Sequence, residues 1–304
     1  MSLGETPWVE KNLKIVLPRL HGRVPDSWLP RTITERTEEV RRGPDWTTTH
    51  ETKKFKKPVF EEYGCGHYGC VLPTHEPGLV IKLTSDISEA RFVARAMELE
   101  PTPGIVEYKK IFGLETSHKG RPLFVLWRTE ASSVGKWDFI RTHGADVVPG
   151  SDQAAWVKHV EREASQQLGG FLSWAKAAQG YLKPKLISSV ADRQKLLTRT
   201  WQLYEHSEPV PNLPLSVSAR LKGMDRVGMV LRTCLYIAQE MTSNESLYKV
   251  GEALQHYLEE GILLADVHGN NIGLDADNIP IITDPGHAVE FHPRWAQPPQ
   301  IMIL

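Results

Sequence analysis

Between residues 58 and 130, short apolar segments alternate with turn-forming residues. Residues 79–83 form a β-branched run directly after a Pro-Gly pair, and residues 105–112 and 123–127 have a similar apolar character. One helix is expected over about residues 85–100, because two prolines follow it and prevent its continuation. The pattern therefore predicts a small antiparallel sheet with one helix.

After residue 130 the apolar positions follow helical spacing. Four helical stretches are expected, over residues 153–179 with an interruption at Gly169-Gly170, 187–206, 216–241 and 246–260. The last of these has apolar residues three and four positions apart, which predicts one buried face. Two short strands are expected near residues 272–274 and 281–283. The second half of the chain is therefore predicted to be mostly helical, with a strand pair near its end.

The first 57 residues contain several prolines and a charged run, so we expect an N-terminal extension with only a short helix near residues 32–42. A lysine cluster at residues 53–57 is expected to be a solvated strand edge or loop, and contact with an acidic partner or a phosphate is the alternative. The chain is thus divided into an extension (1–57), a sheet region (58–130) and a helical region (131–304).

Composition excludes several classes of protein. The 304 residues include 36 Lys and Arg against 37 Asp and Glu, a balance that disfavours a dedicated nucleic-acid binder. The 3 cysteines are too few for a disulfide framework, and we expect free thiols in a reduced, cytoplasmic protein. No apolar run approaches the roughly 20 residues that span a bilayer, and the N-terminus does not resemble a signal peptide. We therefore expect no nucleic-acid partner and no membrane span.

A glycine-rich loop matches the pattern G-x-G-x-x-G-x-V at Gly64, Gly66, Gly69 and Val71. A Rossmann glycine loop opens a helix, whereas two prolines follow here and favour a turn between two antiparallel strands. A kinase glycine flap has this arrangement, and its glycines let backbone N–H groups approach phosphates. Tyr68 lies where such a flap carries an aromatic tip. An ordinary glycine hairpin is the alternative. Zinc binding by Cys65 and Cys70 is disfavoured, because no second cysteine pair accompanies them.

Lys82 follows this loop on an apolar strand, in the Val-Ile-Lys order of the kinase motif. A lysine that points into a core needs a partner, and phosphates together with a helix glutamate would supply one. Glu89 is the first candidate for that glutamate and Glu98 is the second. A solvated helix face is the alternative for each glutamate.

Asp266, His268 and Asn271 form the pattern D-x-H-x-x-N, and Asp284 begins the triplet Asp-Pro-Gly thirteen residues after Asn271. Phosphoryl transfer needs a carboxylate near the acceptor hydroxyl and oxygen ligands for Mg²⁺. The order of glycine loop, strand lysine, D-x-H-x-x-N and Asp-Pro-Gly resembles the protein-kinase-like superfamily. The D-x-H-x-x-N loop is similar to those of HipA-type, UbiB-type and lipid kinases.

This resemblance implies a bilobal α+β fold. Its N-lobe, residues 58–130, would be an antiparallel sheet with one helix, and its C-lobe, residues 131–304, would be mostly helical. The resemblance also implies that Asp266 orients or deprotonates the acceptor hydroxyl. Asn271 and Asp284 would hold Mg²⁺ or Mn²⁺.

The resemblance implies roles for further residues. Lys82 and the glycine loop would contact the phosphates of ATP, and Glu89 would position Lys82. Trp127 to Glu130 would form the hinge beside adenine. His268 would donate to the γ-phosphate when protonated, or alternatively would only hydrogen-bond within its loop.

The chain departs from ordinary protein kinases at four points. Leu264-Ala265 replaces His-Arg before the catalytic Asp, His268 replaces a lysine, and Pro285 replaces the Phe of Asp-Phe-Gly. Only 18 residues follow Gly286, too few for a peptide-docking lobe. We therefore expect residues 131–243 to build the acceptor site.

These features predict an atypical kinase that transfers the γ-phosphoryl group of ATP to a hydroxyl. The resemblance to HipA-type kinases favours a protein Ser or Thr as acceptor, and a small molecule is the alternative. Transfer of a nucleotide to a protein is a further alternative. A pseudokinase that binds nucleotide and acts as an interaction module is the second class of function, favoured by the missing histidine and by Pro285.

Overall fold

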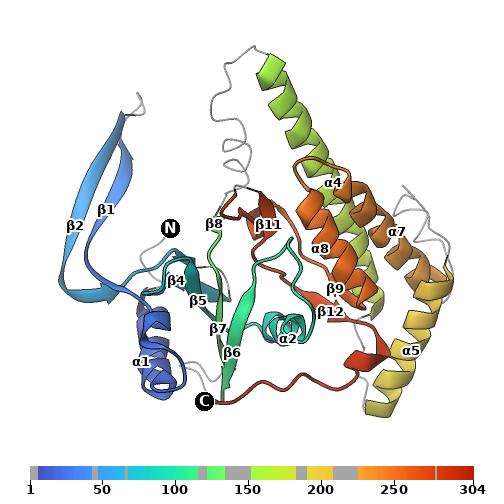
Figure 1. The fold of residues 1–304 in the computed structure, drawn as a ribbon, viewed down its shortest axis with the longest axis horizontal. Helices are drawn as coiled ribbons and strands as arrows, with labels where there is room; N and C mark the ends of the chain where they lie inside the picture. Colours follow the sequence, from blue (N-terminus) through green and yellow to red (C-terminus); the bar gives the residue numbers. More distant parts are fainter. Residues whose placement is uncertain are drawn as a thin grey trace. The chain divides into compact units, whose positions relative to one another are not determined.

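The computed structural model describes residues 6–42, 47–65, 68–115, 122–133, 152–182, 190–207, 225–277 and 279–304. It combines helices with antiparallel sheets, as the sequence predicts (Figure 1). Its contacts divide the chain into two compact units. Unit 1 consists of Met1–Asp86, Lys109–Thr129 and Ile301–Leu304, and unit 2 consists of Ile87–Tyr108 and Glu130–Gln300.

Unit 1 is built on a five-stranded sheet. Its strands, in spatial order, are β3 (Gly64–Cys65), β4 (Gly69–Pro73), β5 (Leu79–Thr84), β7 (Leu123–Thr129) and β6 (Tyr108–Leu114). β5 pairs antiparallel with β4 on one side and β7 on the other, and all of its residues are buried. A central strand buried on both faces favours a mostly apolar run, and the sequence has one there, with Lys82 as the charged exception.

The N-terminal residues contribute to the core of unit 1. Helix α1 (Thr6–Leu20) packs against this core through Val9, Leu13, Val16 and Leu20, all fully buried. These four residues lie on one helical face, because they recur at intervals of three or four. Pro18 lies within the last turn of the helix. The segment that we expected to be only an extension therefore includes part of a hydrophobic core. A short 3-10 helix, η1 (Asp26–Trp28), follows α1.

The expected helix at residues 32–42 is wrong. These residues form strand β1 (Thr32–Arg42), which pairs antiparallel with β2 (Thr47–Phe60) in a two-stranded ribbon (Figure 1). Alternating threonines and charged residues fit this ribbon, since Thr37 hydrogen-bonds Thr52 across the strands at 3.0 Å. The lysine cluster at residues 53–57 lies on β2 with its lysines exposed, as expected.

Unit 2 is mainly helical. Its helices are α2 (Ile87–Ala96), α4 (Asp152–Leu182), α5 (Val190–His206), α7 (Asp225–Thr242) and α8 (Tyr248–Glu259). α7 contacts α4, α5 and α8. The expected helices are confirmed within the described ranges, but α4 continues through Gly169-Gly170 without the expected interruption. The expected helical residues 187–189 and 216–224 lie outside the described residues. None of the described helices is both long and apolar enough to cross a membrane.

α8 buries the apolar face that its sequence predicts, including Val250, Leu254 and Leu258. Gly261 follows the helix with a φ of +78°, which favours glycine, and directs the chain into a set of short strands. These strands are β9 (Ile262–Leu264), β10 (Ile272–Leu274), β11 (Pro280–Ile282) and β12 (Ala288–Glu290). A short strand from earlier in the chain, β8 (Ser132–Ser133), pairs with β10. The expected strands near residues 272–274 and 281–283 are thereby confirmed. A final 3-10 helix, η3, covers Pro293–Trp295.

Candidate functional site

Residues 262–290 form a long hairpin whose ladder is interrupted in the middle. Near the turn, β10 pairs with β11, with Ile272 opposite Ile282. At the base, β9 pairs with β12, with Leu264 opposite Ala288. The residues between these ladders, 265–271 on one arm and 283–287 on the other, therefore face each other. Asp266, His268, Asn271 and Asp284 all lie in this interruption.

Asn271 ties the two arms together. It ends the 3-10 helix η2 (Gly269–Asn271), and its side-chain amide donates to the backbone carbonyl of Asp266 at 2.7 Å. Its own carbonyl accepts the backbone N–H of Thr283 at 2.8 Å and the Thr283 hydroxyl at 3.1 Å. The backbone N–H of Asp284 also points to this carbonyl, at 3.4 Å. The residues predicted from D-x-H-x-x-N and Asp-Pro-Gly are thus brought together within unit 2.

Position 286, the last of Asp-Pro-Gly, requires glycine because of its backbone conformation and because the side chain of Asp266 lies close to it. Gly286 has a φ of +58°, and its N–H donates to Oδ1 of Asp284 at 3.1 Å. A methyl group added to Gly286 would collide with the side chain of Asp266. The Asp-Pro-Gly turn is therefore packed directly against the Asp266 side chain.

Lys176 and His268 have nitrogen atoms near the Asp266 carboxylate. Lys176 Nζ, on α4, is 3.8 Å from Oδ1, and His268 Nε2 is 3.9 Å from Oδ2. His268 Nδ1 accepts the backbone N–H of Asn270 at 3.2 Å, which directs Nε2 toward Asp266. Lys176 was not predicted as a site residue, because it lies on a helix far upstream and belongs to no motif. Lys176 therefore places a lysine near Asp266. In the resemblance to protein kinases, the usual catalytic-loop lysine is replaced by His268.

The oxygen atoms in the hairpin interruption suit Mg²⁺. Asn271 uses its amide nitrogen as donor to Asp266, which leaves its oxygen as the ligand atom. Asp284 adds a carboxylate, and Mg²⁺ in nucleotide sites is commonly held by one or two carboxylates together with phosphates. Among the described residues, no group of three or more His, Cys, Asp or Glu side chains is placed to hold a metal ion. Asn271 and Asp284 therefore offer oxygen atoms of the kind that Mg²⁺ binds.

In unit 1, the glycine-rich loop joins two antiparallel strands, β3 and β4, and does not open a helix. This confirms the expected hairpin arrangement. Gly69 is required for packing, because a Cβ there would collide with the carbonyl oxygen of Leu83, whereas Gly64 has open space around it. Gly66 lies outside the described residues.

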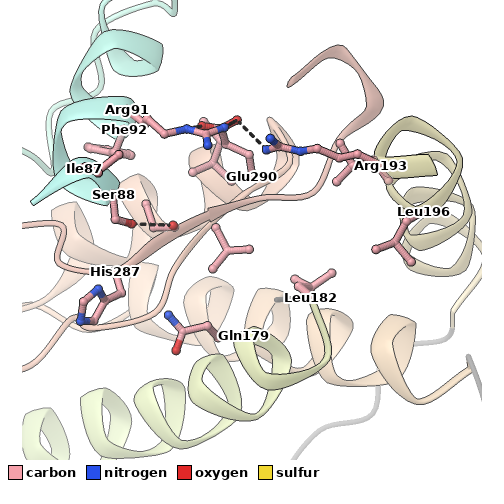
Figure 2. Close-up of a pocket in the computed structure, with 14 residues that line it drawn as sticks. Ile87, Ser88, Arg91, Phe92, Gln179, Leu182, Arg193, Leu196, His287 and Glu290 are labelled. Carbon is pink, nitrogen blue, oxygen red and sulfur yellow. Dashed lines mark hydrogen bonds and ion pairs between the residues drawn. The ribbon is translucent and has the colours of Figure 1, made fainter. Parts of the chain in front are cut away.

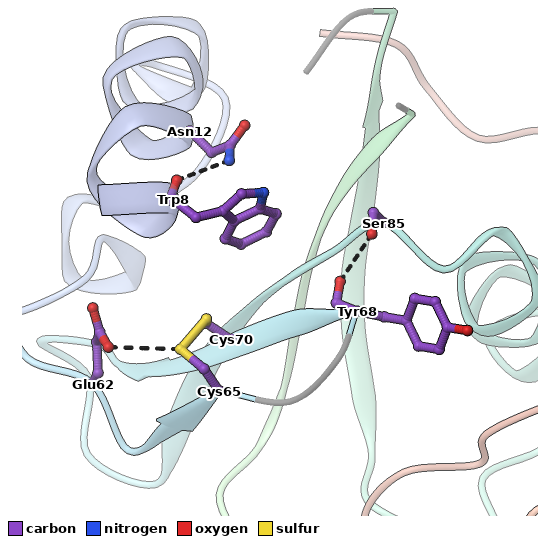
Figure 3. The surroundings of a disulfide bond; sticks show 7 residues. All are labelled: Trp8, Asn12, Glu62, Cys65, Tyr68, Cys70 and Ser85. Carbon is purple, nitrogen blue, oxygen red and sulfur yellow. Dashed lines mark hydrogen bonds between the residues drawn. A yellow bond between two sulfur atoms is a disulfide. The ribbon is translucent and has the colours of Figure 1, made fainter. Parts of the chain in front are cut away.

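Tyr68 is an exposed residue of this loop, with 43% of its surface accessible. Its carbonyl accepts two hydrogen bonds from Ser85, from the backbone N–H at 2.8 Å and from the hydroxyl at 3.1 Å (Figure 3). The end of the loop is thereby fixed to the residue that follows β5.

The expectation that Cys65 and Cys70 are thiols is wrong. The two residues are directly paired across the β3–β4 ladder, with Cα atoms 4.1 Å apart, and they form a disulfide (Figure 3). The spacing of the two cysteines in the sequence does not predict that they form a disulfide. In the structure, the pairing of β3 with β4 places their side chains on the same face of the sheet. Disulfides are typical of oxidising environments, so this bond does not support the expected reduced compartment, which stays a prediction.

Lys82 lies on β5 with only 8% of its surface accessible, opposite Val71 on β4 and Leu126 on β7. Glu89 on α2 is buried as well, with 3% accessible. Glu98, the second candidate partner, is an exposed residue whose carboxylate lies 3.1 Å from Arg95. Pairing of Lys82 with a glutamate stays a prediction.

The expected hinge residues occupy different environments. Trp127 on β7 is completely buried in the core of unit 1, where its ring packs against Phe112 and its Nε1 donates to the carbonyl of Trp28 at 2.9 Å. Its side chain is therefore a core element. Glu130 is exposed and directly follows β7.

The described part of unit 2 places a carboxylate, an amide oxygen and a second carboxylate in one hairpin interruption, with a lysine and a histidine beside them. Such a group can accept a proton and bind a hard cation. No protein-family model matches the chain, and no curated protein matches it. A function must therefore be argued from the residues of the chain itself.

Proposed function

We propose that the chain is an ATP-dependent phosphotransferase with the bilobal fold of the protein-kinase-like superfamily. The observation that carries this proposal is the hydrogen bonding of Asn271, which joins the segment of Asp266 to the segment of Asp284. The two sequence patterns, D-x-H-x-x-N and Asp-Pro-Gly, are neighbours in the hairpin. This arrangement supports a single phosphoryl-transfer centre.

In the proposed reaction, Asp266 orients the acceptor hydroxyl and accepts its proton. The acceptor oxygen forms a bond to the γ-phosphorus as the bond between that phosphorus and the β-phosphate oxygen breaks, and ADP leaves. Asn271 and Asp284 would hold Mg²⁺, which would neutralise charge on the phosphates. Lys176 and His268 lie close enough to Asp266 to keep its carboxylate oriented.

Unit 1 would supply contacts to the nucleotide. Lys82 is buried on β5, and a buried ammonium group is favourable only with anionic partners. The glycine loop is a strand-to-strand turn with an open surface at Gly64, which suits an approaching phosphate. Lys82 and the loop are therefore proposed to contact the phosphates of ATP.

The acceptor is proposed to be a Ser or Thr hydroxyl of a protein, on the resemblance of D-x-H-x-x-N to HipA-type kinases. A small-molecule hydroxyl is the alternative. A second candidate function, nucleotide binding without transfer, is favoured by Leu264 in the usual histidine position and by Pro285 beside Asp284.

Labelled ATP tests this proposal. Purified protein with Mg²⁺ and a cell lysate receives γ-labelled ATP in one reaction and α-labelled ATP in another. We expect label from the γ-phosphate to appear on a protein or small molecule, and its transfer to be lost in Asp266→Asn. Asp277→Asn is a matched control, because Asp277 is an exposed aspartate on the turn of the same hairpin.

Three results would contradict parts of the proposal. Label from the α-phosphate would indicate nucleotide transfer. A rise in melting temperature with ATP, but no transfer of either label, would indicate a nucleotide-binding module. If ATP raises the melting temperature of neither the wild type nor Lys82→Ala, the nucleotide site itself is wrong.

A further inference from the structure

Unit 2 contains a cavity of about 340 Å³ beside the hairpin, and His287, at the end of the interruption, is one of its lining residues. Its walls come from α2, α4, α5 and β12 (Figure 2). Much of the lining is apolar and includes Phe92, Leu182 and Leu196. Cavities of this size are large enough for a small organic molecule.

One side of the cavity carries an unusual group of charges. Glu290, with a side chain only 7% accessible, lies among three arginines. Arg91 donates to both of its carboxylate oxygens, at 3.3 and 3.0 Å. Arg193 and Arg95 each have a guanidinium nitrogen 3.8 Å from Oε2 of Glu290. A single buried carboxylate is therefore shared among three guanidinium groups.

A further carboxylate near these arginines lies outside the cavity. Glu98, an exposed residue, pairs with Arg95 at 3.1 Å and is not part of the cavity lining. The lining itself carries two guanidinium groups, of Arg91 and Arg193, and one carboxylate, of Glu290. The cavity wall therefore has a net positive charge, and both lining arginines remain partly accessible, at 29% and 28% of their side chains.

Arg193 experiences this excess of positive charge. Burial lowers the pKa of its guanidinium, and repulsion from Arg91 and Arg95 lowers that pKa further, while Glu290 acts in the opposite direction. A guanidinium remains charged despite such a shift. An anion next to Arg193 would therefore reduce the repulsion between Arg193 and the two neighbouring arginines.

We propose that this cavity binds a small organic anion. Its phosphate or carboxylate head would contact Arg91 and Arg193, since a guanidinium fork suits both groups. Its apolar body would lie against Phe92, Leu182 and Leu196. The ligand differs from the nucleotide of the proposed function, and the site does not depend on that function.

Isothermal titration calorimetry with simple probes tests this site. The probes are phenyl phosphate, phenylacetate, inorganic phosphate and benzyl alcohol, which separate the head group from the apolar body. We expect phenyl phosphate or phenylacetate to bind most tightly, because each has both an anionic head and an apolar body. Inorganic phosphate lacks the apolar body and benzyl alcohol lacks the charge, so both should bind more weakly. The preferred head group identifies the chemical class of the natural ligand.

Variants then locate the binding. Arg193→Gln should weaken binding of the preferred probe by about tenfold or more, the loss of one charge-assisted hydrogen bond. Arg193→Lys, which retains the charge but loses the fork, should show a smaller loss. Arg199→Gln, an exposed arginine on the same helix, is the matched control and should bind as the wild type does. Asp284→Asn should also bind normally, which separates this site from the proposed phosphotransfer site.

The proposal is overturned if all four probes bind with equal affinity or none binds. It is also overturned if Arg193→Gln and Arg199→Gln bind the preferred probe equally well, since Glu290 and its arginines would then only link α2, α5 and β12. Circular dichroism of each variant without ligand establishes that it is folded. If Arg193→Gln is unfolded, the comparison of Arg193→Lys with Arg199→Gln decides the question.

Discussion

Gly286 and Asp266 are packed so closely that a methyl group on Gly286 would collide with the Cβ of Asp266 and lie 3.1 Å from its Oδ2. Gly286 also has a positive φ of +58°. The position of the Asp266 carboxylate therefore depends on a residue twenty positions later in the chain, on the opposite arm of the hairpin.

Gly286→Ala should displace the Asp266 side chain and reduce phosphoryl transfer by at least about 100-fold, since small misplacements of catalytic groups are costly. Gly22→Ala is the matched control, because Gly22 has a φ of +72° but nothing within 4 Å of an added Cβ. Both variants should lose about 1–2 kcal/mol of stability from backbone strain. Transfer rates and urea denaturation measure the two effects. Equal activity of both variants would contradict the role of the contact.

Lys176 lies on the surface, with 56% of its side chain accessible, so its ion pair with Asp266 should contribute little stability. Lys176→Gln is expected to change the free energy of unfolding by less than about 1 kcal/mol. If Lys176 orients the Asp266 carboxylate in catalysis, the same variant should lower kcat clearly. Lys195→Gln, at an exposed position on α5, serves as control. A kcat of Lys176→Gln that matches Lys195→Gln would assign Lys176 no part in the reaction.

The disulfide between Cys65 and Cys70 predicts a specific alkylation pattern. Without reductant, the folded protein should take up no iodoacetamide, because Cys234 is completely buried and burial raises the pKa of its thiol. After reduction of the folded protein two alkyl groups should be added, and after unfolding three. Mass spectrometry counts them. Two groups added without reductant would mean that the two residues are thiols.

The same disulfide closes a short loop, and loop-closure entropy suggests that it stabilises unit 1 by about 2 kcal/mol. The double variant Cys65→Ser, Cys70→Ser should therefore unfold at lower urea concentration than the oxidised wild type. Reduced wild type should behave like the double variant. An unchanged midpoint in both would contradict this contribution.

We expect the ion pair between Lys249 and Asp275 to make a pH-dependent contribution to stability. Lys249 Nζ lies 2.7 Å from Oδ2 of Asp275, near the turn of the hairpin. Burial acts to raise the pKa of Asp275, but the hydrogen bond from Lys249 and the N–H groups of Ile279 and Asp277 outweigh it, and the pKa is lowered overall. A carboxylate with a lowered pKa in the folded state stabilises the protein above its unfolded pKa. This stabilisation is lost as the pH falls through the folded pKa.

A double-mutant cycle with Lys249→Met and Asp275→Asn measures this pair. The coupling energy from urea denaturation should be about 1 kcal/mol at pH 7 and should shrink as the pH falls from about 5 to about 2. A coupling energy that does not depend on pH would contradict the ionic contribution.

Most elements of the sheet and the helices follow from patterns in the sequence, because burial demands them. β5 is an apolar run and α8 has one apolar face, and both are found as expected. β1 was predicted as a helix because its charged residues resemble a solvated helix face. Pairing with β2 makes it a strand.

The first helix was missed for a different reason. Prolines in the N-terminal segment suggested irregular structure, whereas Val9, Leu13, Val16 and Leu20 carry the signal of a buried helical face. That signal could have been found by counting apolar spacings before considering the prolines.

The D-x-H-x-x-N and Asp-Pro-Gly residues were predicted as a group from order and spacing, and they meet in one hairpin. Lys176 and the arginines around Glu290 could not be predicted in this way. Lys176 reaches Asp266 from α4, and Arg91 and Arg193 reach Glu290 from α2 and α5, so these contacts depend on tertiary packing that residue spacing does not specify.

Unit 1 is assembled from three segments of the chain, the last of which is Ile301–Leu304. Met302 accepts the N–H of Gly113 at 2.9 Å, and Leu304 donates to the carbonyl of Gly113 at 2.8 Å. A ribosome synthesises these residues after every other part of unit 1. The sheet of unit 1 therefore lacks the last segment at its edge until all of unit 2 has been translated. As a result, unit 2 can begin to fold while unit 1 is still incomplete.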